Sequence, residues 1–376
     1  MKHVLSKHVL LAFVLVVLYQ GSSLASDSGR GSAQAEGPVR IGVEPRDVFV
    51  ERTASAQLVS FDFLLENLGA EPARVARIEL SVYDRRGALV LRKFLTAGGL
   101  RHGDYEIARL EPKATAFLFN PFENFSTEVE LASMRYEFFF EAAEGAREFS
   151  ASVNIAPKVF RPKTRLRLPL KGRVLVHDGH DFYSHHRRFN LAHPFLREIG
   201  VTHNFTRFAS DLCVVNERGD LRRQRSDANT DWYGFGATVY APGAGRIVRA
   251  RGDVPDNVNG KSTFTIDDFR KDSTVPAGNF LVIDHRNGEY SLIAHLKQGS
   301  LLVREGDTVR AGQPIGQMGI SGDAYLPHVH YELRSASTVN AHAFPAYFHN
   351  FTRLHGSRRT HVLQGPVDSG DLLESR

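Results

Sequence analysis

The stretch that decides the fold runs from Gly306 to Leu333 and reads GDTVRAGQPIGQMGISGDAYLPHVHYEL. It ends in a run, VHYEL, that is typical of a β-strand, and several glycine turns precede it. His328 and His330 stand one residue apart in this run. Because side chains at i and i+2 of a strand point to the same face, we expect both imidazoles on one side of a sheet. The pattern predicts a ring nitrogen that can bind a metal, with a second ring nitrogen beside it.

Two upstream segments carry matching chemistry. His203 and Asp211 lie in VTHNFTRFASDLCVV, and His295 lies in YSLIAHLKQGS. Catalytic zinc usually takes three protein ligands from His and Asp or Glu and leaves a fourth position for water. Together with His330, His203 and Asp211 would supply two imidazoles and one carboxylate. His295 and His328 would then be free to handle protons at that water, whose pKa zinc can lower to about 7.

At this point the chain resembles the lysostaphin-type (LytM-like) zinc metallopeptidases, which cut peptide cross-links in bacterial cell walls. The resemblance covers roughly residues 201–340. It includes TVYAPGAGRIV (238–248), NFLVIDHRNGEYSLIAHL (279–296) and the 306–333 stretch, in the order of the family. This ordered set is much more specific than any one of its parts.

The resemblance implies a role for each of five residues. The metal ligands would be His203, Asp211 and His330, holding one zinc ion per chain. His295 and His328 would be the catalytic pair that stabilises the attacked carbonyl and the water. All five are present in this sequence, which argues against a site that has lost hydrolysis.

The first ligand is where the chain departs from the family. Seven residues separate His203 from Asp211, where the commonest form of the motif has three, and Asn204 replaces the usual glycine. His185 and His186, in DFYSHHRRFN, are the competing candidates, with His186 first in line. The same two histidines can also be read as a solvated loop or as a pair behind the ligands.

The single cysteine, Cys213, excludes an intramolecular disulfide. It lies two residues after Asp211 on a predicted strand and therefore shares the face of that carboxylate. A thiolate is a good zinc ligand, but a small packed core residue is the simpler interpretation.

Composition limits the partners. The chain has 376 residues, enough for two or three domains, and a formal net charge of +5. Much of the excess lies in residues 158–173, KVFRPKTRLRLPLKGR, which contain no acidic residue. This stretch indicates either a solvated linker or attraction to anionic polymers such as wall glycans. Nucleic acid is not an expected partner, because no recognition motif accompanies the charge.

The N-terminus reads as a secretory signal peptide over residues 1–25. Lys2 and Lys7 precede an apolar core of eleven residues, 9–19, and Ser23-Leu24-Ala25 is a small-x-small cleavage site. Eleven residues are too few to span a bilayer, which needs about 20. An uncleaved anchor is the alternative. We therefore expect an exported protein, periplasmic or extracellular, with no stable membrane span after signal removal.

The remaining chain predicts a mostly β protein. Residues 26–37 read as a flexible linker and 157–200 as a basic connector. Short alternating strands over 38–156 favour an immunoglobulin-like β-sandwich that serves as an accessory domain. Residues 201–376 would form a lysostaphin-type antiparallel β catalytic domain, the zinc metallopeptidase domain, with a C-terminal extension.

Two segments of the catalytic domain are expected beside the substrate groove. The 319–327 loop leads directly into the His-x-His strand and would form one groove wall. The 251–278 insertion, which is polar and rich in turn formers, would be a surface loop next to it. A short helix is expected in FNLAHPFLREIG, and a last strand or two near the C-terminus.

The sequence therefore predicts an exported zinc metalloendopeptidase that hydrolyses peptide bonds with zinc-activated water. Peptidoglycan cross-links are the expected substrate, and another exported peptide or protein is an alternative. A second class of function is a catalytically inactive module that binds the wall or regulates another hydrolase. The oligomeric state and the role of the sandwich stay open.

Overall fold

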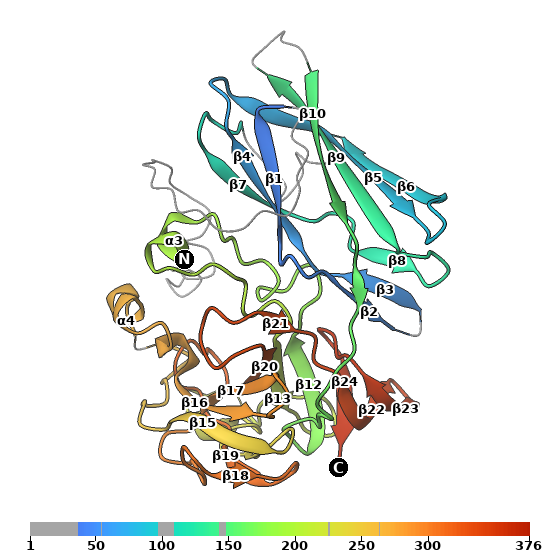
Figure 1. The fold of residues 1–376 in the computed structure, drawn as a ribbon. Coiled ribbons are helices and arrows are strands. Elements are labelled where there is room, and N and C mark those ends of the chain that lie inside the picture. The colour runs from blue at the N-terminus through green and yellow to red at the C-terminus, as the bar shows by residue number, and fades with distance from the viewer. Residues whose placement is uncertain (1–36, 54, 97–108, 143–147, 225, 263) are drawn as a thin grey trace, which may run out of the picture. The chain divides into compact units, whose positions relative to one another are not determined.

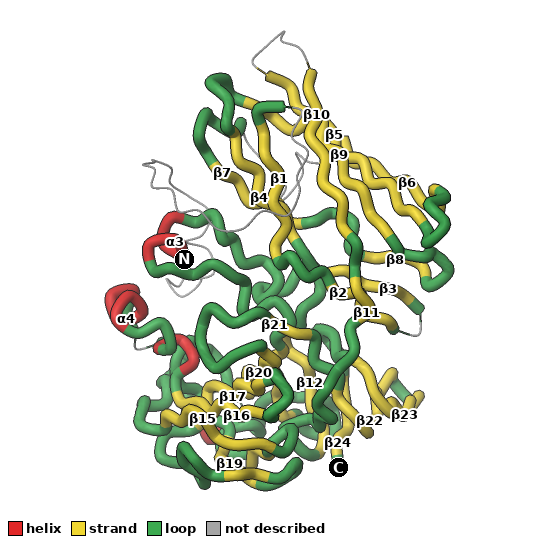
Figure 2. The backbone as a smooth tube through the Cα atoms, in the orientation of Figure 1, coloured by secondary structure: helices red, strands yellow, loops and turns green. Residues whose placement is uncertain are grey.

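The computed structural model describes residues 37–376 except 54, 97–108, 143–147, 225 and 263 (Figure 1). The predicted signal peptide and nearly all of the predicted linker, up to residue 36, lie outside the described residues. The chain divides into an N-terminal unit, the described part of Leu10–Phe160 with Asn190–Arg197, and a C-terminal unit, Arg161–Phe189 with Glu198–Arg376. Strands and loops make up nearly all of both units, which confirms the predicted mostly β fold (Figure 2).

The N-terminal unit contains three small sheets, with strand orders β1-β4-β7, β10-β9-β5-β6 and β11-β2-β3-β8. Every pair is antiparallel except β11 with β2. The bounds are β1 Val39–Glu44, β2 Phe49–Arg52, β3 Ala56–Val59, β4 Asp62–Asn67, β5 Ala73–Tyr83, β6 Leu89–Thr96, β7 Thr115–Phe119, β8 Asn124–Ser126, β9 Ser133–Ala142, β10 Glu148–Ile155 and β11 Lys158–Val159.

Period-two burial builds the core of this unit. In β9, the sequence SMRYEFFFEA buries Met134, Tyr136, Phe138 and Phe140 fully, while the residues between them are exposed or half-buried. Such alternation places one face of a strand against the core and the other toward solvent. The strands agree with the alternating runs in the sequence. The immunoglobulin-like arrangement stays a prediction.

The C-terminal unit is built on one large sheet with the strand order β18-β15-β16-β17-β20-β13-β12-β24-β22-β23, with β21 paired to β20 and a separate β14-β19 pair. The described bounds are β12 Gly172–Asp178, β13 Ser210–Val214, β14 Thr238–Tyr240, β15 Gly245–Arg251, β16 Asn279–Asp284, β17 Tyr290–Leu296, β18 Thr308–Val309, β19 Pro314–Gln317, β20 Val329–Arg334, β21 Ala343–Phe344, β22 Phe348–His355, β23 Arg358–Gly365 and β24 Leu372–Ser375. β12 lies in the segment predicted as a connector, where LPLKGRVLVHDG was expected as a strand of the catalytic sheet, and it pairs with β13 inside this sheet.

The two faces of this sheet have different chemistry. On β20, Val329, Tyr331 and Leu333 pack into the main hydrophobic core of the unit. The alternate positions, His330, Glu332 and Arg334, are buried as well but point to the opposite face. Polar side chains buried on a sheet face need partners. The face opposite the core is therefore where a polar site can form.

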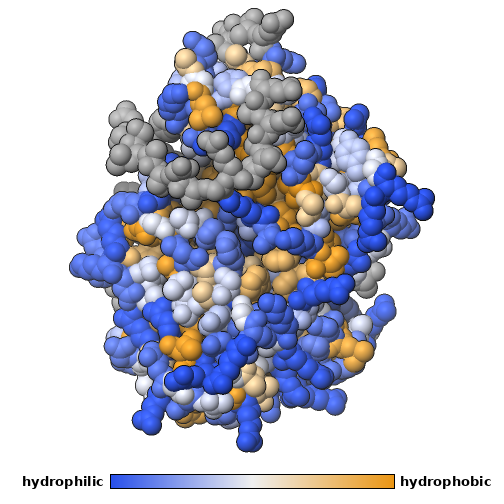
Figure 3. Space-filling view, viewed as in Figure 1, coloured by the Kyte–Doolittle hydropathy of each residue, from blue (hydrophilic) through white to orange (hydrophobic). Residues whose placement is uncertain are grey.

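Among the residues that the structure describes, helices are few and short. They are α3 Pro194–Glu198, α4 Ile266–Lys271, and the 3₁₀ turns η2 Asn229–Asp231 and η3 Val275–Ala277. α4 begins with a capping box, in which Thr265 and Asp268 exchange hydrogen bonds. Over the residues that the structure covers, no helix has the length and apolar character needed to cross a membrane. In the view of Figure 3, hydrophilic residues cover most of the visible surface of the C-terminal unit.

Candidate metal centre

Strand register brings the polar side chains together. Asp211 on β13 stands opposite His330 on β20 and, on its other side, opposite Asp178 at the end of β12. His330 in turn stands opposite Ala294 on β17, the residue before His295. Four neighbouring strands therefore present their residues at one level of the sheet.

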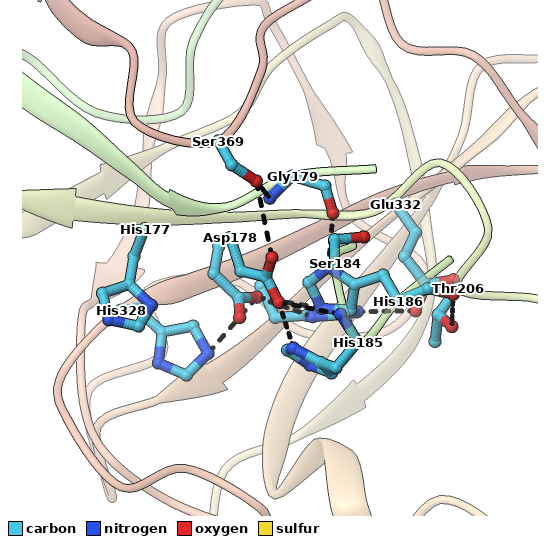
Figure 4. Close-up of polar contacts among 12 residues, drawn as sticks. His177, Asp178, Gly179, Ser184, His185, His186, Thr206, His328, Glu332 and Ser369 are labelled. Atoms are coloured by element: carbon cyan, nitrogen blue, oxygen red, sulfur yellow. Dashed lines mark hydrogen bonds and ion pairs between the residues drawn. The ribbon is translucent and has the colours of Figure 1, made fainter. Parts of the chain in front are cut away.

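Asp211 is the centre of this group. Its side chain is buried, and its Oδ1 atom lies 2.9 Å from Nδ1 of His330, 3.4 Å from Nε2 of His186 and 3.4 Å from Nε2 of His328. Figure 4 shows His186 and His328 approaching the same region from different segments of the chain. Three imidazole nitrogens thus converge on one carboxylate oxygen.

The contacts of His186 fix which of its nitrogens can bind a cation. Nδ1 lies 2.9 Å from the carbonyl oxygen of Gly179, and because a carbonyl only accepts, Nδ1 carries the proton. Nε2 is buried and has no hydrogen-bond partner among the residues described here, with Asp211 3.4 Å away. Asn204 and Thr206 donate to the carbonyl of His186 at 3.0 and 3.1 Å and hold its backbone. A buried lone pair beside a carboxylate matches what a metal site requires.

Backbone carbonyls orient two further rings in the same way. Nδ1 of His328 donates to the carbonyl of Leu326 at 2.9 Å, and Nδ1 of His295 donates to the carbonyl of Ser321 at 2.8 Å. In their neutral forms, both rings therefore have the lone pair on Nε2. The two ring centroids lie 4.6 Å apart. The geometry provides two neighbouring proton acceptors at the edge of the centre.

The ring of His330 is turned the other way, with Nδ1 and not Nε2 facing Asp211. Its Nε2 lies 2.7 Å from Oε1 of Glu332, which is also paired with Arg334. Burial by itself raises the pKa of Glu332, but the charge of Arg334 and the hydrogen bonds from His330 and Arg334 lower it to about 2. The ionised carboxylate accepts from Nε2, so Nδ1 is the atom that faces Asp211. The lone pair of Nδ1 and the carboxylate of Asp211 would repel each other at 2.9 Å unless a cation lies between them. That cation is either a proton on Nδ1 or a metal ion.

The charge states suit metal binding. Burial raises the pKa of Asp211, but the charges of His328 and His186 outweigh burial and hold the pKa well below its usual range. Burial lowers the pKa of His186, and burial together with the charges of His328 and His330 lowers that of His295 further. Asp211 is therefore ionised and His186 and His295 are neutral, as zinc binding requires, whereas the raised pKa of His330 means that its ring would release a proton to a metal.

The structure brings together four of the five residues singled out in the sequence: Asp211, His295, His328 and His330. The ring centroids of His295 and His330 lie 5.7 Å apart. His203 is placed elsewhere, with its ring centroid 4.2 Å from that of His342. The predicted ligand thus lies against another histidine, while the adjoining Asn204 supports the backbone of His186.

Sequence reasoning did not identify Asp178. Each of Asp178, His185, His186 and Asp211 places a possible ligand atom within 4.8 Å of the others. His185 forms an ion pair with Asp178, which also contacts Ser369 at 3.4 Å (Figure 4). The available signal was the position of Asp178 at the end of an apolar strand, seven residues before the paired histidines.

Cys213 takes the packed role of the two that were considered. It is fully buried on β13, and burial raises the pKa of its thiol. The thiol therefore stays protonated, which disfavours it as a metal ligand.

Comparison with known protein families identifies part of the region that contains this centre. Residues 230–342 match the model of peptidase family M23. The matched region contains His295, His328 and His330, whereas His186 and Asp211 lie before it.

The similar proteins share only part of this chain. The peptidoglycan DD-endopeptidase ShyA of Vibrio cholerae is 44% identical over 57 residues, which are 15% of this chain and 13% of that protein. ShyB of the same organism, also named a peptidoglycan DD-endopeptidase, is 31% identical over 99 residues, 26% of this chain and 18% of that protein. The chain thus spans less than a fifth of the length of these curated relatives. The solved structure of the deep-sea M23 metalloprotease pseudoalterin is 14% identical, with a TM-score of 0.26 over 55% of this chain and 99% of that one.

Proposed function

Because residues 230–342 form a peptidase family M23 domain, we propose that this protein is an exported zinc endopeptidase that cleaves peptide cross-links in peptidoglycan. The relatives named as peptidoglycan DD-endopeptidases support this substrate. The basic stretch at residues 158–173 suits an anionic polymer. Export follows from the predicted signal peptide and from the location of a cell-wall substrate.

The proposed metal ligands are Nε2 of His186, Oδ1 of Asp211 and Nδ1 of His330. This set replaces the predicted His203, whose ring lies against His342. The observation that carries the proposal is the orphaned Nε2 of His186, which is buried 3.4 Å from Asp211 while its Nδ1 is held by a carbonyl. Two imidazoles and one carboxylate fit a catalytic zinc ion that keeps an open position.

Bound zinc would supply Lewis-acid polarisation of the peptide carbonyl and a water of lowered pKa. The lone pairs on Nε2 of His295 and His328 would serve as acceptors for a proton of the attacking water. Once protonated at Nε2, either ring becomes a donor to the developing oxyanion or to the leaving amine. The carbonyls that hold each Nδ1 keep these rings from turning during the transfer.

The test compares His186→Ala with His203→Ala. Zinc per chain is measured on the purified mature protein, and release of fragments from purified peptidoglycan is measured in parallel. We expect about one zinc ion per chain and full hydrolysis in the wild type and in His203→Ala, and loss of both in His186→Ala. Loss of zinc only in His203→Ala would return the ligand role to His203. A folded wild type without zinc or hydrolysis would favour the inactive wall-binding or regulatory module.

A further inference from the structure

The loop Gly319–Pro327 controls both proposed catalytic histidines through its carbonyl groups. Ser321 accepts the Nδ1 proton of His295 at 2.8 Å, and Leu326 accepts that of His328 at 2.9 Å. Moving either carbonyl would free its ring to rotate or to exchange tautomers. The position of this loop therefore determines the orientation and the tautomer of both rings.

Asn257, in the 251–278 insertion, holds the centre of this loop. Its Nδ2 donates to the carbonyls of Gly322 and Ala324, both at 2.8 Å, and its backbone N–H donates to that of Ile320 at 3.1 Å. The side chain is fully buried. One residue thus contacts three carbonyls of this loop, and those of Gly322 and Ala324 lie between the two that orient the histidines.

The neighbours of Asn257 bind the same loop. Asp256 accepts from the backbone N–H of Ile320 at 2.9 Å and from that of Gln298 at 3.1 Å. Gly260, which has a positive φ of 63°, lies so close to Tyr325 that an added Cβ would stand 2.5 Å from its carbonyl oxygen. The 256–260 segment is therefore packed on the loop through both hydrogen bonds and direct backbone contact.

The chemistry of this position calls for an amide. Two carbonyl acceptors require two N–H donors, which Asn provides and Asp does not. The Oδ1 atom of Asn257 is buried with no hydrogen-bond partner within the described part of the chain. A buried acceptor without a partner is unfavourable, so Oδ1 does not explain why an amide stands here. The two N–H donors of Nδ2, which both have partners, do explain it.

We propose that Asn257 is a positioning residue, which fixes the Gly319–Pro327 loop so that Ser321 and Leu326 hold His295 and His328 with their lone pairs on Nε2. Within the described part of the chain, the hydrogen bonds of Asn257 go to the loop and not to either histidine, so its effect would be transmitted through the loop. The kinetic part of this inference rests on the proposed peptidase function. The structural part, the orientation of the two rings, does not.

The experiment compares Asn257→Asp with Asn259→Asp in the full mature chain loaded with zinc. Both variants make the same chemical change two residues apart, but Asn259 is exposed at the tip of the turn. Three quantities are measured: zinc per chain, kcat and KM on purified peptidoglycan fragments, and the ring tautomers of ¹⁵N-labelled histidines by NMR. If Asn257→Asp does not fold, Asp256→Ala, which removes the contact to Ile320, takes its place.

For Asn257→Asp we expect unchanged zinc, a kcat lower by about 10-fold or more with a smaller change in KM, and mixed tautomers at His295 and His328. Asn259→Asp should match the wild type in all three quantities. Wild-type kcat and single tautomers in a folded Asn257→Asp would overturn the proposal. A wild type that neither holds zinc nor cleaves would defeat the proposed function instead, and the ring spectra of the two variants would still decide the role of Asn257.

Discussion

Glu332 accepts a hydrogen bond from Nε2 of His330 at 2.7 Å, and this contact leaves Nδ1 of the ring facing Asp211. Such a carboxylate behind a metal-binding histidine fixes the tautomer and makes the ring a stronger ligand. Glu332, which is buried, would therefore support the proposed metal through the ring of His330.

Replacing Glu332 by Gln should weaken zinc binding by about 10- to 100-fold, because the negative charge behind His330 is lost. Zinc affinity is measured by competition with a chromogenic chelator at fixed pH. Glu217→Gln, at an exposed position, is the matched control and should bind zinc as the wild type does. Equal affinity in a folded Glu332→Gln would show that Glu332 does not support the metal site.

Replacing His295 by Ala should leave zinc in place and lower turnover by on the order of 10²-fold or more, since a proton acceptor is lost and no proposed ligand is removed. Zinc content and hydrolysis of purified peptidoglycan are measured on the same preparation. His355→Ala removes an exposed histidine and should change neither quantity. Loss of zinc in His295→Ala would assign that residue to the metal.

His330 gives the metal-free chain a distinct pH dependence. Burial lowers the pKa of His330, but the hydrogen bonds with Asp211 and Glu332 outweigh burial and raise it from 6.5 to about 9. A raised pKa stabilises the folded state fully below about pH 6.5, and the stabilisation is lost as the pH rises through about 9. The Tm of the metal-free chain should therefore fall across this window, relative to the Tm of metal-free His330→Gln.

Zinc should show the opposite trend, because it requires Nδ1 of His330 without its proton. Its affinity for the folded wild type should rise with pH up to about 9 and then level off. Isothermal titration over this range measures the effect. An affinity that does not change with pH would exclude proton release from His330 on binding.

A hydrogen-bonded chain in the same unit predicts a stability effect. Ser291 contacts the buried hydroxyl of Tyr331 at 2.9 Å and Nε2 of His285 at 2.7 Å. Ser291→Ala leaves both groups without this partner and should lower the free energy of unfolding by about 1–3 kcal/mol. Urea unfolding followed by fluorescence of Trp232, the only tryptophan, reports on the C-terminal unit. Ser262→Ala, at an exposed position, should have little effect.

The sequence predicted the structure well where the side chains follow the two-residue repeat of a β-strand. The His-x-His spacing predicts two imidazoles on one face, and both His328 and His330 reach Asp211. Alternating apolar residues likewise predict the mostly β fold. In both cases, the prediction needs only the geometry of a single strand.

Non-local pairing could not be read in the same way. His186 reaches Asp211 because β12 pairs with β13, and a strand pairing over this distance leaves no local pattern. A last strand or two was expected near the C-terminus, but no local pattern in GPVDSGDLLESR indicates that β24 pairs with both β12 and β22. The 251–278 insertion was expected as a surface loop, but Asn257 in it is fully buried.

The position of β24 also bears on the order of folding. β12 carries Asp178 at its end and lies between β13 and β24, so one edge of this strand is completed only by residues 372–375. Pairings between segments so distant in sequence form slowly, because the long intervening loop must first be closed. While the chain is being synthesised, the sheet that supports the candidate metal centre remains unfinished until residues 372–375 have been made. Assembly of the proposed site, and with it any hydrolysis, would then be delayed until β24 has been synthesised.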